Sequence, residues 1–236
     1  MSERRVISNR MFGIAAALVA ACFMCVALAG CSGPTPTDTV KQAMEAIKAQ
    51  NTDNLAQVYS GDASSISSEM MGSDSTSDSL SDTSDLTDSQ KQVYDKLKQM
   101  FYDFDYTLSD EQIDGDTATV KVTVKAHDMG SAFSKAVSDT MSTALMYAFS
   151  SDQEAAKKAT TDALYDALDT QLDAHTDKDT TNTATVTLHK QDGKWKIDSF
   201  DNEFYNAISG GLVDTISNMN SAFGSSSSST SSSTSE

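Results

Sequence analysis

An unbroken alternation of apolar and polar residues runs from Thr117 to Ala126 and constrains the fold more than any other stretch of the chain. A period of two is typical of a strand that buries one face and exposes the other. We therefore expect an α+β fold in which helices cover one face of a curved antiparallel sheet. The buried face would carry Ala118, Val120, Val122, Val124 and Ala126.

The pairing partner of this strand should precede it, because Asp114-Gly115 is a typical hairpin turn. A two-residue loop over these residues would set Leu108 against Lys121 and mismatch the two apolar faces. A three-residue loop from Asp114 to Asp116 instead pairs Leu108 with Val122. Since a one-residue slip moves every side chain to the opposite face, we predict the three-residue loop with a bulge.

A second hairpin is predicted closer to the C-terminus. Apolar residues alternate over 184–188 and again over 195–197, and Asp192-Gly193 between them is a strong two-residue turn. This turn pairs Leu188 with Ile197. Together the two hairpins give an apolar inward face made of Ala118, Val120, Val122, Val124, Ala184, Val186, Leu188 and Ile197.

Apolar residues recur at helical spacing elsewhere in the chain. The stripes cover residues 40–47, 55–59, 93–104, 133–149, 156–172 and 204–223. Thr37 or Asp38 should cap the first helix. The fourth and fifth stripes predict a helical hairpin, bent near Ser150–Asp152, that is inserted between the two β-hairpins. The last helix should be weakened at Gly210-Gly211.

Two segments are rich in serine, threonine and aspartate and poor in apolar residues. Residues 60–89 carry scattered aspartates, but their spacing does not match a calcium-binding loop. Residues 225–236 are almost pure serine and threonine. Neither composition can build a core, so we expect a disordered acidic insertion and a disordered tail around a domain that spans 39–224.

The N-terminus has the pattern of a secretory signal. Arginines precede Met11–Ala29, which carries no charge, and Leu28-Ala29-Gly30-Cys31 follows at its end. This ending resembles a bacterial lipobox. The resemblance implies cleavage between Gly30 and Cys31, removal of residues 1–30, and fatty acyl chains (palmitate) on Cys31, with 31–38 as a short tether. The alternative is an uncleaved membrane anchor with a chance cysteine.

The signal segment would also remove the other two cysteines, Cys22 and Cys25, so their C-x-x-C spacing carries no redox or metal site. After cleavage the net charge falls from −17 to about −19. Such an acidic surface excludes nucleic acid as a partner, since phosphate binding needs a basic face. The expected location is the extracytoplasmic face of the cell membrane, reached through the lipid on Cys31.

The order of elements, with the segments "IDGDTATVKVTVKAHD" and "TATVTLHKQDGKWKID", resembles the nuclear-transport-factor-two-like (cystatin-like) superfamily. More narrowly, it resembles domains of unknown function in lipoproteins of Gram-positive bacteria. The strand ending at Asp192–Asp198 is the most recognisable part, and the similarity runs from about Asp38 to Ile208. It implies a curved sheet wrapped around a helix, often with a cone-shaped pocket, and none of its motifs is catalytic.

Titratable groups are nearly absent from the expected inward face, where Tyr106 alone brings a hydroxyl. Tyr106 and Trp195 are the residues we would assign to a candidate pocket. Because side chains alternate along a strand, His127 and His189 fall on the same side as the polar residues and should point outward. His175 should lie near a helix C-terminus. No pair of histidines has metal-ligand spacing, and we expect no metal and no cofactor.

We therefore expect a membrane-anchored, non-enzymatic module that binds an unknown small ligand or a partner protein. One alternative is a structural or spacer lipoprotein without a ligand, which a filled sheet–helix interface would favour. The other is an isomerase- or dehydratase-like enzyme of the same superfamily, which a pocket holding Tyr106 beside a buried carboxylate would favour.

Overall fold

The computed structural model describes residues 33–66 and 86–224. The chain divides into two units, Met1–Gly33 and Pro34–Glu236, and the helices and strands that follow belong to the second. The expected signal peptide 1–30, the lipobox from Leu28 to Cys31 and the tail 225–236 lie outside the described residues, as does the middle of the 60–89 segment. None of the helices formed by the described residues is both long enough and apolar enough to cross a membrane.

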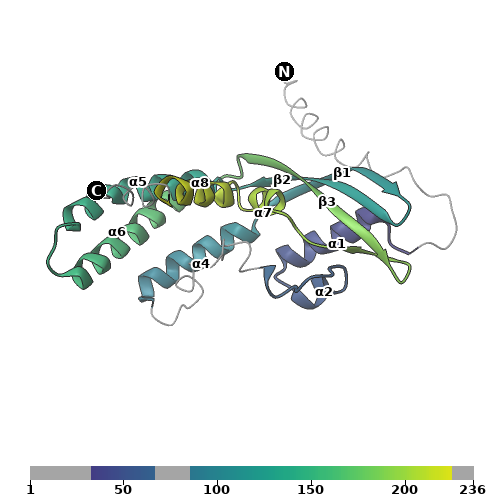
Figure 1. The fold of residues 1–236 in the computed structure, drawn as a ribbon, viewed down its shortest axis with the longest axis horizontal. Coiled ribbons are helices and arrows are strands. Elements are labelled where there is room, and N and C mark those ends of the chain that lie inside the picture. Colours follow the sequence, from purple (N-terminus) through teal and green to yellow (C-terminus); the bar gives the residue numbers. More distant parts are fainter. Residues whose placement is uncertain (1–32, 67–85, 225–236) are drawn as a thin grey trace, which may run out of the picture. The chain divides into compact units, whose positions relative to one another are not determined.

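Helices and strands follow one another in the predicted order (Figure 1). Their bounds are α1 (Pro36–Lys48), α2 (Thr52–Ala56), α4 (Asp88–Tyr102), β1 (Asp105–Asp114), β2 (Thr117–Ala126), α5 (Met129–Tyr147), α6 (Gln153–Ala174), β3 (Thr180–Gln191), β4 (Lys194–Ile197), α7 (Asn202–Ile208) and α8 (Leu212–Gly224).

The described strands form an antiparallel sheet in the order β1-β2-β3-β4. In the first hairpin Leu108 pairs with Val122, as predicted, but the predicted three-residue loop is wrong. Asp114 pairs with Thr117 across a two-residue loop, and the register shifts between Ser109 and Gln112 instead. A bulge inside the strand accommodates the extra residue. Residues Asp105–Ser109 of β1 therefore keep the register that aligns the apolar faces of the two strands.

The second hairpin matches its prediction. Leu188 pairs with Ile197, and Gln191 with Lys194, around the two-residue turn. Asp192 and Gly193 both have positive φ, 51° and 76°, as a turn that fits the right-handed twist of the strands requires.

The inward face of the sheet packs on α1 and α7, and all of its predicted inward positions are buried. Large side chains fill the space between sheet and helices, among them Met44, Phe104, Phe204 and Ile208. Phe200 stacks between Tyr59 and Phe204, with ring centroids 5.2 and 4.0 Å apart. The result is an α+β fold with a curved antiparallel sheet against helices, consistent with the cystatin-like architecture. Its sheet–helix interface is filled.

The start of α1 corrects the predicted cap. Thr35, not Thr37 or Asp38, caps the helix: its hydroxyl accepts from the backbone N–H of Asp38, and the Asp38 carboxylate accepts from the backbone N–H of Thr35. Pro36 then occupies the first helical position, where its missing N–H costs nothing. The helix therefore begins inside the segment expected to be tether.

The predicted helical hairpin is present as α5 and α6, and Asp152 caps α6 through the backbone N–H of Ala155. Its core is small: Val93, Ala132 and Leu172 form a separate buried cluster. The large apolar residues toward the turn are exposed, notably Leu145 and Phe149.

The last predicted helix is split into α7 and α8 at the two glycines. Gly210 and Gly211 have φ of +56° and +85°. A Cβ on Gly210 would lie 1.7 Å from the carbonyl oxygen of His127, so only glycine fits this close approach. The break turns α8 onto α5, where the backbone N–H of Gly130 donates to the carbonyl of Gly210.

Candidate functional site

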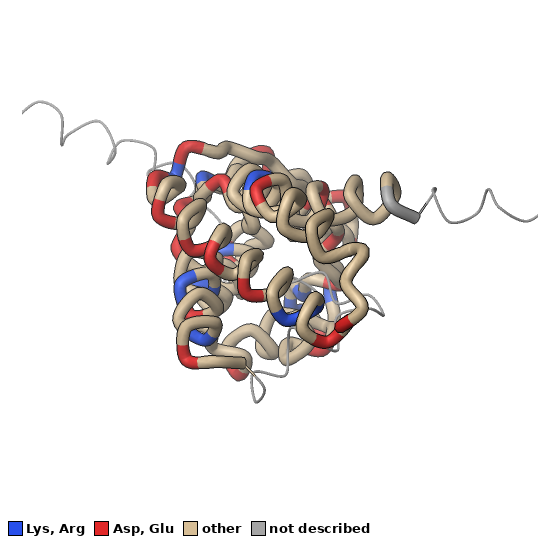
Figure 2. The backbone as a smooth tube through the Cα atoms, turned by 90° about the vertical axis from the view of Figure 1, so that its left-hand side faces the viewer, with Lys and Arg blue, Asp and Glu red and all other residues tan. Residues whose placement is uncertain are grey.

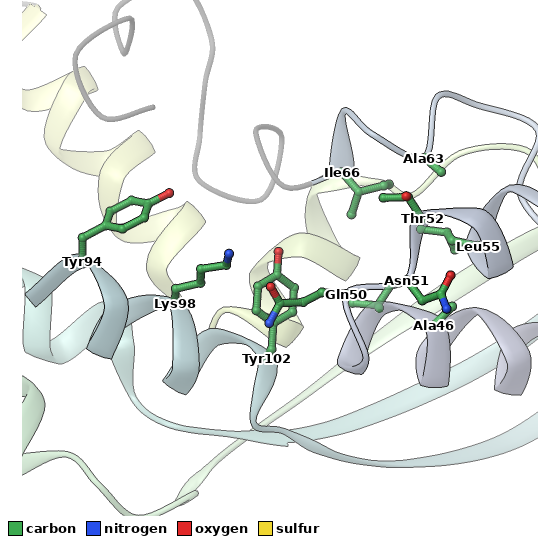
Figure 3. A pocket seen from close by; sticks show the side chains of 11 residues that line it. Ala46, Gln50, Asn51, Thr52, Leu55, Ala63, Ile66, Tyr94, Lys98 and Tyr102 are labelled. Atoms are coloured by element: carbon green, nitrogen blue, oxygen red, sulfur yellow. The ribbon is translucent and has the colours of Figure 1, made fainter. Parts of the chain in front are cut away.

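A pocket of about 200 Å³ lies between the C-terminal end of α1, the start of α2 and one face of α4 (Figure 3). Its floor is apolar and its walls are polar or aromatic. The lining residues are Ala46, Ile47, Gln50, Asn51, Thr52, Leu55, Ala63, Ile66, Tyr94, Lys98 and Tyr102. Ala63 and Ile66 belong to the segment that the sequence assigned to the acidic insertion, and both are buried here.

Helix α4 supplies the aromatic wall. Tyr94, Lys98 and Tyr102 are spaced i, i+4 and i+8, so they lie along one face of the helix. Val93 and Phe101 face the protein interior. The apolar stripe that predicts this helix from the sequence does not reveal the site. The regular Tyr-Lys-Tyr spacing on the neighbouring face was the signal that could have found it.

Lys98 carries an unpaired positive charge within the part of the chain that the structure describes. It is half-buried, as are Lys48, Lys96, Lys178 and Lys196. Each of the other four has a partner. Lys48 lies over the rings of Phe104 and Tyr106, and Lys196 donates to the carbonyls of Ala56 and Gln57. Lys96 pairs with Asp169 and Asp173, and Lys178 pairs with Asp103 and Asp105. In a chain with 34 acidic and 17 basic residues, a half-buried lysine without any such partner is unexpected.

The opposite wall is formed where α1 ends. The backbone N–H of Asn51 donates to the carbonyl of Ala46 at 2.8 Å, and the N–H of Gln50 donates to Ile47 at 2.9 Å. These bonds close the helix in a Schellman motif, with Gln50 in the left-handed conformation at φ 52°. Glycine is the usual residue there, and a side chain costs about 1 kcal/mol.

The two residues assigned to a pocket from the sequence are not brought together. Tyr106 is on β1 and Trp195 on β4, which are the opposite edges of the sheet. Trp195 is buried beneath the ammonium group of Lys190, 4.8 Å from the ring centroid. It lines a separate hollow of about 370 Å³ beside Thr39 and Gln42.

The hydroxyl of Tyr106 donates to Glu45 Oε1 at 2.5 Å. Burial, with the hydrogen bond and charge of Glu45 adding to it, raises the pKa of Tyr106 well above its ordinary value. The phenol therefore stays protonated. Glu45 is exposed, and neither residue lines the pocket of Figure 3.

The prediction for His127 is wrong. The residue is buried, because the chain leaves the strand after Ala126 and turns into α5, where strand parity no longer applies. Its Nε2 lies 3.2 Å from Asp103 Oδ2, and its Nδ1 has no partner among the described residues. His189 is exposed as predicted and bonds Asp198. His175 ends α6, and its Nδ1 lies 2.8 Å from the carbonyl of Gln171.

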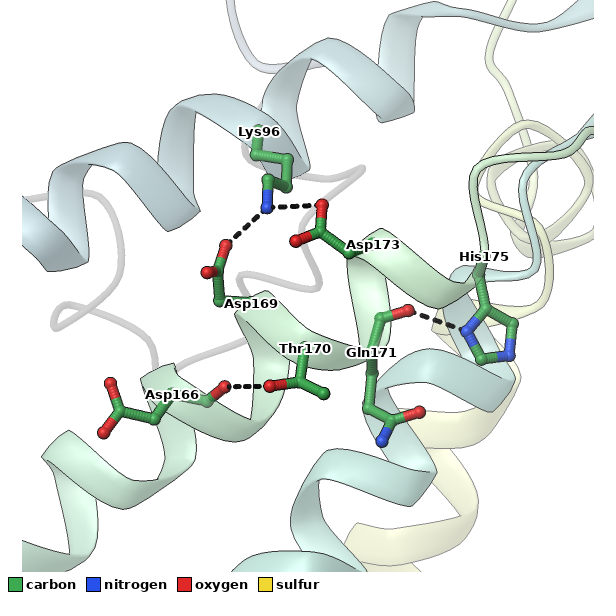
Figure 4. Close-up of polar contacts among 7 residues, drawn as sticks. All are labelled: Lys96, Asp166, Asp169, Thr170, Gln171, Asp173 and His175. Atoms are coloured by element: carbon green, nitrogen blue, oxygen red, sulfur yellow. Dashed lines mark hydrogen bonds and ion pairs between the residues drawn. The ribbon is translucent and has the colours of Figure 1, made fainter.

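A second polar cluster joins α4 to α6 (Figure 4). Lys96 Nζ lies 2.5 Å from Asp169 Oδ1 and 2.8 Å from Asp173 Oδ1. The hydrogen bonds that Lys96 donates to these two carboxylates raise its pKa. The cluster has its own counter-charges and is a tie between helices. Within the described ranges no group of three His, Cys, Asp or Glu residues is arranged to hold a metal ion.

Comparisons with known proteins give little to set beside this geometry. No family model matches the sequence, and no curated protein matches it significantly. Among solved structures, a candidate lipoprotein from Bacillus subtilis subsp. subtilis str. 168 (ycdA) is similar over 74% of this chain, at 17% identity and a TM-score of 0.42. The chain spans 57% of that protein's length. Membership of the nuclear-transport-factor-two-like superfamily therefore stays a prediction from the sequence.

Proposed function

We propose that this chain is a lipid-anchored extracytoplasmic binding module without catalytic activity, and that its ligand occupies the pocket between α1, α2 and α4. The observation that carries the proposal is Lys98, a half-buried lysine that lines the pocket and has no partner among the described residues. A half-buried lysine without a partner gains nothing from its position in the pocket, so the arrangement is best explained by a ligand that pairs with it.

The anchor rests on the sequence. The arginines before Met11, the uncharged run and the Leu28-Ala29-Gly30-Cys31 ending favour lipid attachment at Cys31 and a place at the outer face of the membrane. Two acyl chains would be needed for lasting attachment, since one chain binds only marginally.

The absence of catalysis is proposed from the inward face of the sheet. Every predicted inward position there is apolar and buried. Tyr106 does have a carboxylate neighbour, but Glu45 is exposed to water. A general acid–base pair on this face, as in an isomerase- or dehydratase-like enzyme of the same superfamily, would need a sheltered titratable group there.

A spacer role without a ligand is the second candidate, because one observation favours it. The sheet–helix interface, where the resemblance implies a cone-shaped pocket, is filled by Met44, Phe104 and Phe204. The binding proposal therefore depends on the pocket of α1, α2 and α4 rather than on the concave side of the sheet.

The anchor is tested by Cys31→Ser in the full chain expressed in a bacterium with a lipoprotein pathway. We expect the variant to leave the membrane fraction or to keep its signal segment uncleaved, and to take up no labelled fatty acid. A membrane-bound, lipid-labelled Cys31→Ser protein would refute the lipobox.

The binding role is tested by weighing the full chain, purified in detergent from its own host, under native conditions. A discrete additional mass is expected, and removing it should lower the thermal stability. A ligand at 100 times its dissociation constant stabilises by about 2.7 kcal/mol, enough to detect. A mass equal to that of the lipidated chain alone, with no thermal shift on adding a host extract, would favour the spacer role.

A further inference from the structure

Gln50 is the unusual residue among the backbone positions with positive φ. Outside glycine, the described residues hold three such positions: Gln50, Asp110 and Asp192. Aspartate tolerates the left-handed region because its short side chain bonds locally, and it is common in turns. Glutamine has no such advantage. A glycine at position 50 would close α1 with less strain, so the side chain of Gln50 does not help to stabilise this end of the helix.

The retained side chain lies in the same pocket as the unpaired Lys98. Gln50 comes from the end of α1, and Lys98 comes from α4 across the pocket, between Tyr94 and Tyr102 (Figure 3). Two independent oddities, a strained glutamine and an uncompensated lysine, thus meet at one site. Each supplies hydrogen-bond donors to the cavity.

Resting on the proposed function, we infer that the pocket binds a small carboxylate that carries hydroxyl or amino groups, with Lys98 pairing with the carboxylate and Gln50 bonding its polar neighbour. The ammonium group offers three donors and no acceptor, which suits an oxyanion. The Gln50 amide offers both a donor and an acceptor, which suits a hydroxyl or an amine. A volume of about 200 Å³ admits a molecule the size of an amino acid or a sugar acid, below the range of drug-sized ligands.

The acidic surroundings make this selectivity sharper. The chain has a net charge of −17, so it repels anions in general, and only a site with its own cation can hold one. Lys98 sits on a helix that also carries Lys91, which is exposed and lies outside the pocket. Lys91 therefore serves as a matched control for loss of charge.

The first experiment titrates the full chain in detergent, by calorimetry, with L-lactate, L-glutamate and D-glucuronate. D-Glucose serves as the neutral counterpart of glucuronate, and inorganic phosphate as a different oxyanion. We expect at least one carboxylate to bind and glucose not to bind. Lys98→Met should weaken that binding about 10- to 100-fold, the loss typical of a charged hydrogen bond, and Lys91→Met should leave it unchanged.

Three results would overturn the assignment: phosphate binding without any carboxylate, carboxylate binding that survives Lys98→Met, or no binding by any member of the panel at millimolar concentration. In the last case an additional mass on the natural protein would still support the proposed function, and only the ligand class would be wrong.

The second experiment separates ligand recognition from folding. Gln50→Gly should raise the midpoint of thermal unfolding, because it relieves the left-handed strain, and should weaken carboxylate binding about three- to tenfold. Asp192→Gly, at a left-handed position outside the pocket, should leave binding unchanged. If Gln50→Gly binds as well as the natural chain, the role of Gln50 is refuted.

Discussion

The sheet half of the protein and the helical hairpin are built on different principles. Between the sheet and the helices α1 and α7, large side chains such as Phe204, Met44 and Ile197 are fully buried. Around α5 and α6 the separate cluster has Val93, Ala132 and Leu172 as its buried members. Since stabilisation follows the apolar area removed from water, the sheet half should dominate the stability of the fold.

The hairpin compensates with polar ties and leaves its turn end uncovered. In Figure 2 charged residues recur along α6, whereas residues 140–147 at the end of α5 include none. Leu145, Met146 and Phe149 are 63, 69 and 95% exposed there. The α6 stripe is mostly alanine, whose side chain buries little area. An amphipathic pattern therefore predicts a helix correctly without guaranteeing that its apolar face is covered.

The largest expected contrast is between two phenylalanines. Phe204→Ala should lower the free energy of unfolding by about 3–5 kcal/mol, because it opens a cavity in the filled interface. Phe149→Ala, at an exposed position, should change it by less than about 0.5 kcal/mol. Urea unfolding followed by circular dichroism measures both. Equal losses would mean that the hairpin turn is packed in solution.

Leu172→Ala tests whether the small cluster holds the hairpin by itself. Leu172 is 1% exposed, and its truncation should cost about 2–3 kcal/mol. The effect should be local: amide hydrogen exchange should accelerate in α5 and α6, while β2 and β3 keep their protection. Uniform acceleration across the sheet would show instead that both halves unfold as one cooperative unit.

Lys96→Met probes the polar tie between α4 and α6. Its ion pairs with Asp169 and Asp173 are partly exposed, so removal should cost at most about 1 kcal/mol. Lys91→Met on the same helix is the control and should be neutral. Raising the salt concentration should reduce the difference between the two variants, and a salt-independent difference would indicate lost packing rather than lost charge.

The sequence predicted the sheet well because the information was local. The alternation over Thr117–Ala126 identifies every inward residue of β2, and the Asp192-Gly193 turn specifies its hairpin completely. The bulge in β1 could not be located, because the apolar faces constrain the inner register and say nothing about where the extra residue goes. His127 was misplaced because parity was extended past the end of the strand.

The candidate site was out of reach for a different reason. Its walls come from residues far apart in the chain, with Gln50 at the end of α1 and Lys98 on α4, and their meeting depends on how the helices pack. The face of α4 that carries Tyr94, Lys98 and Tyr102 could be read from spacing alone. The sequence could not show that Lys98 would lack a partner, because tertiary contacts decide which lysines are paired.

The smallest expected effect concerns pH and the junction of the two halves, where Asp103 follows α4. A hydrogen bond from Lys178 lowers the pKa of Asp103 below its ordinary value of 3.8. Partial burial opposes this effect, and a hydrogen bond with His127 adds to it. Because the pKa of Asp103 is lower in the folded protein than in the unfolded chain, its ionised carboxylate stabilises the fold at pH values above the unfolded-state pKa. This stabilisation is lost as the pH falls through the folded-state pKa. Asp103→Asn should therefore flatten the stability profile below about pH 4. Because the carboxylate is 57% exposed, the loss at neutral pH should stay under about 1 kcal/mol. Acid titrations of unfolding in the natural chain and in Asp103→Asn measure this difference, and identical slopes would show that the junction contributes nothing.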